Sequence, residues 1–386
     1  MSVSEALPGA PDPWAASEMP QWRDGPPYLM TEMIAAEPAL AERLARRLAS
    51  DPMLAEVASA VRAAADSGAA ITLTGCGTSE HAAMAGAEIL NAALVVSGLP
   101  PVARAVQALE SLRRPQPDGL LIAVSHEGGT EATIEAMRGA AGAGARVALI
   151  TVSGRSPAAA HASLVIETAE QDRSWCHTVG YLSPVVAVGA VAALVSDDAL
   201  DAVALRGLLD AADQPLVAEE VAAGLLPCGR LIVAGFGIDY VTARELALKI
   251  EEGARLPAVA HQLETVRHGH LAAADPRTGL LLVWSDAEEP APTVQGRLLG
   301  LLEAARSLGM PAGAILDVAN GPRVPRALTP AGRLSIPSTR RMQRAAEALA
   351  GAAIPLQQLT ERLARARGVN PDTLAREDPR QAAAGG

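Results

Sequence analysis

The feature of the sequence that most constrains the fold is a unit that occurs twice. In each copy a short apolar run enters a G-x-G turn, and a helix-like segment follows. The first copy is the run 71–75 with its turn at 75–77, and the second is the run 230–237 with its turn at 235–237, 160 residues later. A β-branched run that ends in glycine ahead of a helical segment predicts a strand, a tight turn and a helix. The matching positions predict two halves of the same architecture.

Further apolar runs alternate with helical segments in both halves, which predicts parallel sheets covered by helices on both faces. The expected strands are at 71–75, 119–125, 146–152, 163–168, 230–237, 280–284, 313–318 and 333–337. The expected helices are at 30–64 with a break at Asp51-Pro52, then 80–96, 178–195, about 201–223 and 240–254. We therefore predict an α/β protein with an N-terminal arm (1–27), two α/β/α domains (28–200 and 201–370) and a C-terminal tail (371–386).

Composition excludes several classes of function. The net charge of −11 disfavours binding to nucleic acids or anionic membranes, and an aromatic content of 2% disfavours base stacking. The N-terminus lacks the features of a signal peptide, no apolar run is suited to span a bilayer, and the three cysteines show no pairing pattern. We expect a cytoplasmic protein. Neither G-x-G turn has the third glycine of a dinucleotide site, so no cofactor is expected.

Two loops are candidate anion sites. Residues 75–79 supply hydroxyls and backbone N–H groups at a helix N-terminus, with Gly77, Thr78 and Ser79 as the candidate residues. Helix capping by Thr78 or Ser79 explains the same pattern equally well. Residues 125–130 also follow a strand, and their glycines allow close approach of a ligand to the backbone. Loops at the ends of adjacent parallel strands are expected to face one crevice. The candidates in the second loop are Ser125, His126, Glu127, Gly128 and Thr130.

Glu245, Lys249 and Glu252 are spaced so that they share one face of the helix that follows the second G-x-G turn. A surface ladder of ion pairs is the commonest explanation of such spacing. The helix is otherwise apolar, however, and a carboxylate beside a lysine is a suitable general base for moving a proton between two sugar carbons.

A third polar segment, 264–270, contains Arg267 and His268. His126, His177 and His268 lie in separate candidate loops, but they form no metal-ligand pattern, so no metal site is expected.

Taken together, these motifs resemble the SIS (sugar isomerase) domain family, most closely the isomerase half of glucosamine-6-phosphate synthase and related isomerases, deaminases and deglycases. The resemblance covers about residues 28–376. Its motifs in this chain are GCGTS (75–79), SHEGGT (125–130), DRSWCHT (172–178), ELALKIEE (245–252) and ETVRHG (264–269). The implied fold is a pair of flavodoxin-like three-layer domains with parallel sheets.

The resemblance also implies roles. Glu252 falls at the position of the proton-transferring base, with Lys249 and Glu245 beside it. His268 matches a histidine that opens the sugar ring and, in the family, comes from the partner subunit, which implies a homodimer. Ser79, Ser125 and Thr130 match hydroxyls of the anion loops.

Three departures modify these implications. Residue 2 is serine rather than the cysteine of a glutaminase domain, so glutamine-dependent amide transfer is not expected. The family's imine-forming lysine has no counterpart, and Arg376 is the nearest basic residue. Arginine stays protonated and cannot form the imine. Glu127 stands where the family usually has serine, and His126 stands where it often has glutamine. A carboxylate beside a phosphate dianion is repelled, which favours a sulfonated or uncharged sugar unless Glu127 turns away.

Three hypotheses of function follow. The first is aldose–ketose isomerisation of an anionic hexose, a 6-phosphate or 6-sulfonate, through a cis-enediol intermediate. The second is deamination or deglycation of an amino-sugar phosphate. The third is a sugar-phosphate sensor without catalysis, against which the acidic charge and the filled base position both argue.

Overall fold

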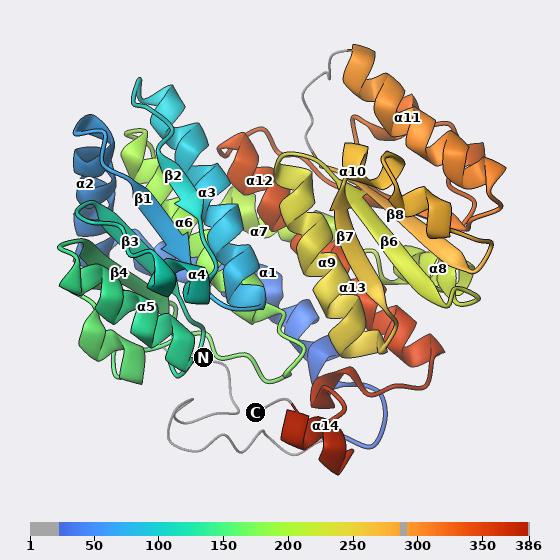
Figure 1. Cartoon of the computed structure of the whole chain (residues 1–386), viewed down its shortest axis with the longest axis horizontal. Coiled ribbons are helices and arrows are strands. Elements are labelled where there is room, and N and C mark those ends of the chain that lie inside the picture. Colours follow the sequence, from blue (N-terminus) through green and yellow to red (C-terminus); the bar gives the residue numbers. More distant parts are fainter. Residues whose placement is uncertain (1–22, 286–291, 385–386) are drawn as a thin grey trace.

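The computed structural model describes residues 23–285 and 292–384, which form two five-stranded parallel sheets flanked by helices (Figure 1). The strand order is β2-β1-β3-β4-β5 in the first sheet and, read from its β7 edge, β7-β6-β8-β9-β10 in the second. Counted from the first strand of each half, both orders are 2-1-3-4-5, the flavodoxin-like order. The predicted fold class and the predicted repeat are confirmed.

The strands lie close to their predicted positions, with two additions. The first sheet contains β1 (Ile71–Thr74), β2 (Ala103–Ala105), β3 (Leu120–Val124), β4 (Arg146–Thr151) and β5 (Leu164–Glu167). The second contains β6 (Arg230–Gly235), β7 (Ala258–Gln262), β8 (Thr278–Trp284), β9 (Ala312–Asp317) and β10 (Gly332–Ile336). The edge strands β2 and β7 were not predicted.

The helices of the first half are α1 (Leu29–Leu48), α2 (Pro52–Asp66), α3 (Thr78–Val96), α4 (Ala108–Arg113), α5 (Glu131–Gly142), η1 (Pro157–His161) and α6 (Val179–Val195). The following helices are α7 (Ala202–Ala212), α8 (Pro215–Leu225), α9 (Ile238–Ala254), α10 (Leu263–Arg267), η2 (His270–Ala273), α11 (Pro292–Ser307), η3 (Gly321–Arg323) and η4 (Arg326–Leu328). The chain continues through α12 (Arg344–Gly351), α13 (Ala353–Ala366), η5 (Pro371–Thr373) and α14 (Pro379–Ala384).

The break predicted at Asp51-Pro52 separates α1 from α2. The Asp51 carboxylate accepts a hydrogen bond from the backbone N–H of Met53 at 2.9 Å, and Pro52 occupies the first position of α2. Both are standard signals for starting a helix, since proline there loses no hydrogen bond.

Among the residues that the structure describes, no helix is long and apolar enough to cross a membrane.

The core of the first half lies between β1, β3 and a helical layer that contains α3 and α6. Every residue of β1 and β3 is buried, as expected for strands covered on both faces. Helix α6 is buried around almost its whole circumference because α1, α2, α3 and α12 pack against it. A helix that is apolar on all sides is stable only in such a position.

The two halves meet where α3 packs on α9 and where α1 packs on α13 (Figure 1). Helix α12 belongs to the second half in sequence but also packs on α3, α6 and α7. The domain boundary near residue 200 stays a prediction. Of the predicted N-terminal arm, residues 1–22 lie outside the described residues.

The predicted C-terminal tail needs a correction. Asp372 in η5 is fully buried, and its carboxylate accepts hydrogen bonds from the backbone N–H groups of Leu29 and Met30 at the start of α1. The first N–H groups of a helix have no partner within the helix, so a buried helix start requires such an acceptor. Residues 371–373 are therefore part of the folded structure and not a surface tail.

Candidate active site

The loop between β1 and α3 is fixed by its glycines. Gly77 has φ +57°, a conformation that disfavours other residues, and a Cβ at Gly75 would lie 2.6 Å from the backbone of Ser79. The second half repeats this: Gly237 has φ +53°, and a Cβ at Gly235 would lie 2.4 Å from the carbonyl oxygen of Asp239. The two turns share a strand-to-helix geometry, so the glycines alone do not indicate a ligand.

The two candidate anion loops lie next to each other. β1 pairs directly with β3, so residues 75–79 and 125–130 both follow the carboxyl ends of neighbouring strands. The Cys76 Sγ lies 3.8 Å from the Thr133 Oγ1 in the first turn of α5. The N-termini of α3 and α5 therefore meet at this edge, which is where open α/β sheets bind ligands and where backbone N–H groups attract anions.

The candidate side chains of these loops differ in exposure. Thr78 and Ser125 are buried, Ser79 is half-buried, and Gly77 and Thr130 are exposed. Gly128 has φ +70°, and a Cβ there would lie 2.3 Å from the Ser156 Oγ, so this position tolerates only glycine. Gly128 therefore fixes the shape of the loop.

His126 is buried and makes a contact within the protein. Its Nε2 accepts a hydrogen bond from the backbone N–H of Asp172 at 3.0 Å. Burial, followed by the nearby His177, lowers the pKa of His126 to about 3. The ring is therefore neutral and holds residues 172–178 against the second anion loop.

Asp172 organises this segment. Its carboxylate accepts hydrogen bonds from the backbone N–H groups of Ser174 at 3.1 Å, Thr178 at 2.6 Å and Gly180 at 2.9 Å. The result is a tight loop at the N-terminus of α6 that carries Cys176 and His177.

His177 lies between the second anion loop and α9. Its ring centroid is 5.2 Å from that of His126, and it is close enough to lower the pKa of both Glu127 and Glu245. The buried Cys176 Sγ is 3.8 Å from the carbonyl oxygen of Lys249. Residues 172–178 thus connect the first sheet to the polar face of α9.

The polar face of α9 is buried, so Glu245, Lys249 and Glu252 are not a surface ladder of ion pairs. Glu245 and Lys249 are 0% exposed, and the Glu252 side chain is 23% exposed. The Lys249 Nζ forms a short ion pair with the Glu252 Oε2 and lies 3.8 Å from the Glu245 Oε1. The Glu245 Oε2 lies 2.7 Å from the Nδ1 of His81 in α3.

The charges of this cluster support each other. Burial opposes the ammonium form of Lys249, but Glu252 and Glu245 outweigh it and raise the pKa of Lys249 above its ordinary value. Burial likewise opposes the charged form of Glu245, but Lys249 and His81 outweigh it and lower the pKa of Glu245. Lys249 is therefore a fixed cation, and Glu252 is the one carboxylate of the cluster that reaches solvent. Such a carboxylate can act as a general base.

Glu127 is half-buried at the same edge. Burial raises the pKa of Glu127, while the nearby His177 and Arg376 act in the opposite direction. The Arg376 guanidinium lies 3.7 Å from the centre of the Trp175 ring, a cation–π contact that holds it beside residues 172–178. A carboxyl group with an elevated pKa lies where a phosphate-binding hydroxyl was expected.

Arg267 and His268 lie apart from this cluster. Both are exposed, the His268 Nε2 is 3.4 Å from the Glu264 Oε2, and Arg267 lies against α11 near Gly300. Within the described residues, neither side chain contacts Glu252. The roles predicted for Arg267 and His268 stay predictions.

Residues 65–195 match the model of the SIS domain family. The chain has an SIS domain. This domain holds both anion loops, residues 172–178 and α6, and the resemblance predicted from the motifs is confirmed. The second sheet lies beyond the matched residues and repeats the strand order of the SIS domain.

A curated relative supports the same assignment. The glutamine–fructose-6-phosphate aminotransferase (isomerizing) of Aeropyrum pernix is 29% identical over 294 residues, which cover 71% of this chain and 46% of the relative. The chain spans just under half the length of the curated relatives it matches.

Solved structures confirm the fold across both halves. The C-terminal domain of the Francisella tularensis glucosamine-fructose-6-phosphate aminotransferase has a TM-score of 0.74 at 20% identity and covers 91% of this chain and 99% of that domain. Tagatose-6-phosphate ketose/aldose isomerase from Escherichia coli has a TM-score of 0.71 at 18% identity, covering 91% and 96%. Glucosamine-6-phosphate deaminase from Thermotoga maritima has a TM-score of 0.67 at 16% identity, covering 89% and 97%.

The sequence did not reveal two parts of the site, His81 and the organising role of Asp172. His81 follows the GCGTS loop by two residues on an alanine-rich helix, and that was its one available signal. Within the described residues, no group of three or more histidine, cysteine, aspartate or glutamate side chains is arranged to hold a metal ion.

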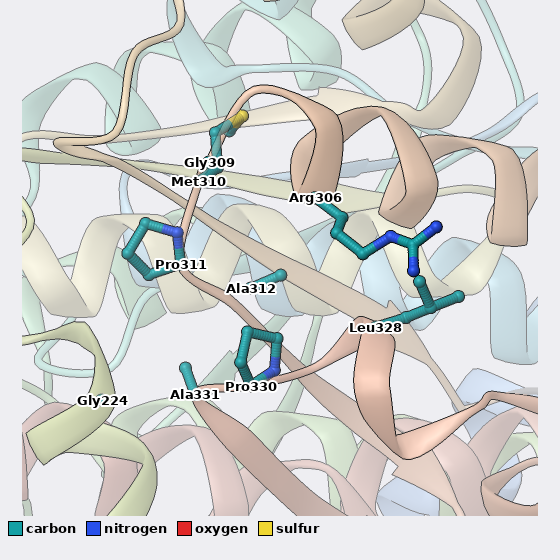
Figure 2. Close-up of a pocket in the computed structure, with 9 residues that line it drawn as sticks. All are labelled: Gly224, Arg306, Gly309, Met310, Pro311, Ala312, Leu328, Pro330 and Ala331. Carbon is teal, nitrogen blue, oxygen red and sulfur yellow. The ribbon is translucent and has the colours of Figure 1, made fainter.

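A separate cavity of about 350 Å³ lies at the other end of the second sheet (Figure 2). Its lining includes Ala312 at the start of β9 and Ala331 just before β10, so it adjoins the amino ends of these strands. Arg306 is its one charged lining residue, and that side chain already pairs with Glu303 at 2.5 Å. The cavity is not part of the site around the SIS domain.

Proposed function

We propose that this protein is an aldose–ketose isomerase that acts on an anionic hexose. The observation that carries the proposal is the ion pair of the buried Lys249 with Glu252, on the helix that His81 at the start of α3 contacts through Glu245. Glu252 takes a proton from one of the two carbons C1 and C2 and returns it to the other through a cis-enediol intermediate. Lys249 keeps the carboxylate oriented through the ion pair.

The anion loops hold the far end of the sugar. Gly77 and Thr130 are exposed and Ser79 is half-buried, so their backbone and hydroxyl groups are available to an anion at the N-terminal ends of α3 and α5. His177 and Arg376 add positive or hydrogen-bonding groups near Glu127. The matched relatives act, by their names, on sugars that carry a 6-phosphate, which supports an anionic substrate for this chain.

Glu127 bears on the identity of the anion. An ionised Glu127 repels a phosphate dianion more strongly than a sulfonate monoanion, because the interaction scales with the product of the charges. Its raised pKa reduces this repulsion but does not supply the hydroxyl that it replaces. We therefore place a 6-sulfonate beside the 6-phosphate as candidate substrates.

We further propose a homodimer in which His268 of one copy assists ring opening in the site of the other. The exposure of His268, which on its own chain contacts Glu264, supports this arrangement. Because the side chain is exposed, it is accessible to the site of a second copy. The proposal is tested by mixing two variants expected to be inactive, Glu252→Gln and His268→Asn. Mixed dimers regain activity if the site is shared, and they remain inactive if each copy is self-contained.

The reaction is tested by NMR in D₂O with three sugars: fructose 6-phosphate, 6-sulfofructose and glucosamine 6-phosphate. A new aldose with deuterium at C2 establishes isomerisation and identifies the anion. Release of ammonia from glucosamine 6-phosphate assigns the protein to deamination instead. Binding of a sugar without turnover of any of the three contradicts the proposal and favours a sensor.

A further inference from the structure

His81 connects the anion loop to the proposed base. It lies in the first turns of α3, directly after residues 75–79, and is 5% exposed. Its Nδ1 is 2.7 Å from the Glu245 Oε2. The pKa of Glu245 is lowered, so this carboxylate is a pure acceptor, and the His81 Nδ1 must carry the proton and donate it.

The two oxygens of Glu245 have unequal partners. Oε2 accepts the His81 hydrogen bond, whereas the buried Oε1 has no hydrogen-bond partner among the described residues and lies 3.8 Å from the Lys249 Nζ. The Tyr181 hydroxyl is buried nearby and likewise lacks a hydrogen-bond partner in the described part of the chain; burial and then the charge of Glu245 raise the pKa of Tyr181. Glu245 is thus held toward α3 and stops short of a hydrogen bond to Lys249.

This arrangement decides which carboxylate receives the lysine. A buried ammonium needs a close carboxylate partner. Two carboxylates, those of Glu245 and Glu252, lie near the Lys249 ammonium. With Glu245 held by His81, Lys249 pairs closely with Glu252. Without His81, Glu245 is expected to turn toward Lys249, satisfy its open oxygen and draw the ammonium away from Glu252.

We propose that His81 is a positioning residue for the proposed isomerisation. By holding Glu245 on α3, it directs the Lys249 ammonium to Glu252 and fixes the orientation of the reacting carboxylate. Because His81 and the loop 75–79 belong to one helix start, the same hydrogen bond couples the anion site to the base. The expected effect on the reaction rate rests on the proposed function. The expected movement of Lys249 rests only on its contacts with Glu245 and Glu252.

The kinetic test compares His81→Leu with His81→Asn. Leucine fills the buried space without a donor, whereas the asparagine amide can replace the Nδ1–H. By analogy with hydrogen bonds that orient metal ligands, we expect His81→Leu to lower kcat by roughly 10- to 100-fold, with KM changed less than about twofold. His81→Asn should stay within about threefold of the wild type. Equal losses in both variants, or a loss confined to KM, overturn the proposal.

A double-mutant cycle tests whether His81 acts through Glu245. In the Glu245→Gln background, His81→Leu should cause no more than about a twofold further loss, because residues that act as a unit are not additive. Independent, additive losses contradict the proposed route.

A crystal structure of His81→Leu separates this inference from the proposed function. The expected result is that the Lys249 Nζ moves to hydrogen-bond distance of Glu245 and releases Glu252. An unchanged Lys249–Glu252 pair overturns the inference even if the enzyme is an isomerase. The movement supports it even if the reaction proves to be deamination.

Discussion

Asp372 caps the first helix of the protein through a hydrogen bond of 2.7 Å from the backbone N–H of Leu29, a residue 343 positions earlier in the chain. Met30 donates to the other carboxylate oxygen at 2.9 Å. The backbone carbonyl of Asp372 also accepts a hydrogen bond from Trp175 at 3.3 Å, so the C-terminal segment holds both α1 and the loop that carries His177. The end of the chain therefore contributes to the site as well as to stability.

Asp372→Ala should destabilise the protein, since it leaves two buried N–H groups at a helix start without an acceptor. The expected loss in the free energy of unfolding is about 1–2 kcal/mol, measured by urea denaturation. Asp372→Asn keeps one acceptor oxygen and should lose less. Asp198→Ala is the control, because Asp198 is exposed and accepts a hydrogen bond from its neighbour Ala199. Equal stability of Asp372→Ala and the control would show that the cap is dispensable.

Glu37 gives the protein a pH-dependent stability. It is fully buried beside Gln357, whose Nε2 donates to the Glu37 Oε1 at 3.0 Å, and burial raises the pKa of Glu37 well above 4.5. The folded state therefore retains a proton that the unfolded chain loses above about pH 4.5. The stability that protonated Glu37 contributes is fully present below that pH. It is lost as the pH rises through the pKa that Glu37 has in the folded protein.

Glu37→Gln removes this titration. The variant should gain stability relative to the wild type as the pH increases from about 4.5 to 8, in urea denaturation at several pH values. Glu219→Gln, at an exposed carboxylate, should show a constant difference from the wild type. A constant difference for Glu37→Gln as well would mean that Glu37 is ionised in the folded protein.

The matched turns at Gly77 and Gly237 separate fold from function. Both have positive φ, and no atom lies within 4 Å of a Cβ added at either position. Alanine should therefore cost a similar conformational energy at each site, about 1–3 kcal/mol. Only Gly77→Ala should also weaken substrate binding, because only that turn belongs to the proposed anion site. The checks are urea denaturation and KM, and an equal rise of KM in both variants would contradict the assignment.

Lys249→Met should abolish turnover and destabilise the fold. It removes the cation between two carboxylates, one of them fully buried, and breaking a buried ion pair costs about 3–5 kcal/mol. Combining Lys249→Met with Glu245→Gln should recover part of the lost stability without restoring activity. Thermal unfolding and the isomerase assay together check this, and a Lys249→Met protein with substantial activity would exclude a role for the ammonium in catalysis.

Most of the fold could be predicted from the sequence because buried parallel strands are continuous apolar runs, as in Leu120–Val124 and Thr278–Trp284. The edge strands were missed for a physical reason. Ala103–Ala105 is three residues long, and Ala258–Gln262 contains polar and small residues, so both are strands because they pair with β1 and β6. Pairing across the sheet is not a local property of the sequence.

The candidate site was predictable only in part. The spacing of Glu245, Lys249 and Glu252 and the two glycine-containing loops are local patterns, and both were identified. The contacts of His81 with Glu245 and of Asp372 with Leu29 join residues 164 and 343 positions apart. They depend on how α3 meets α9 and where the chain ends, and the spacing of residues along one helix or loop does not encode them.

The central claim is that Glu252 moves a proton between two carbons of the substrate. The most direct test follows deuterium from D₂O into the sugar with the wild type, Glu252→Gln and Glu251→Gln, using the sugar that the wild type converts. Glu251 is the matched control, since it is the adjacent carboxylate on α9, is exposed, and accepts a hydrogen bond from the backbone N–H of Ala258. If Glu252 is the base, Glu252→Gln binds the sugar with nearly unchanged affinity and incorporates no deuterium, while Glu251→Gln behaves as the wild type. Deuterium incorporation by Glu252→Gln at a rate close to that of the wild type would contradict it.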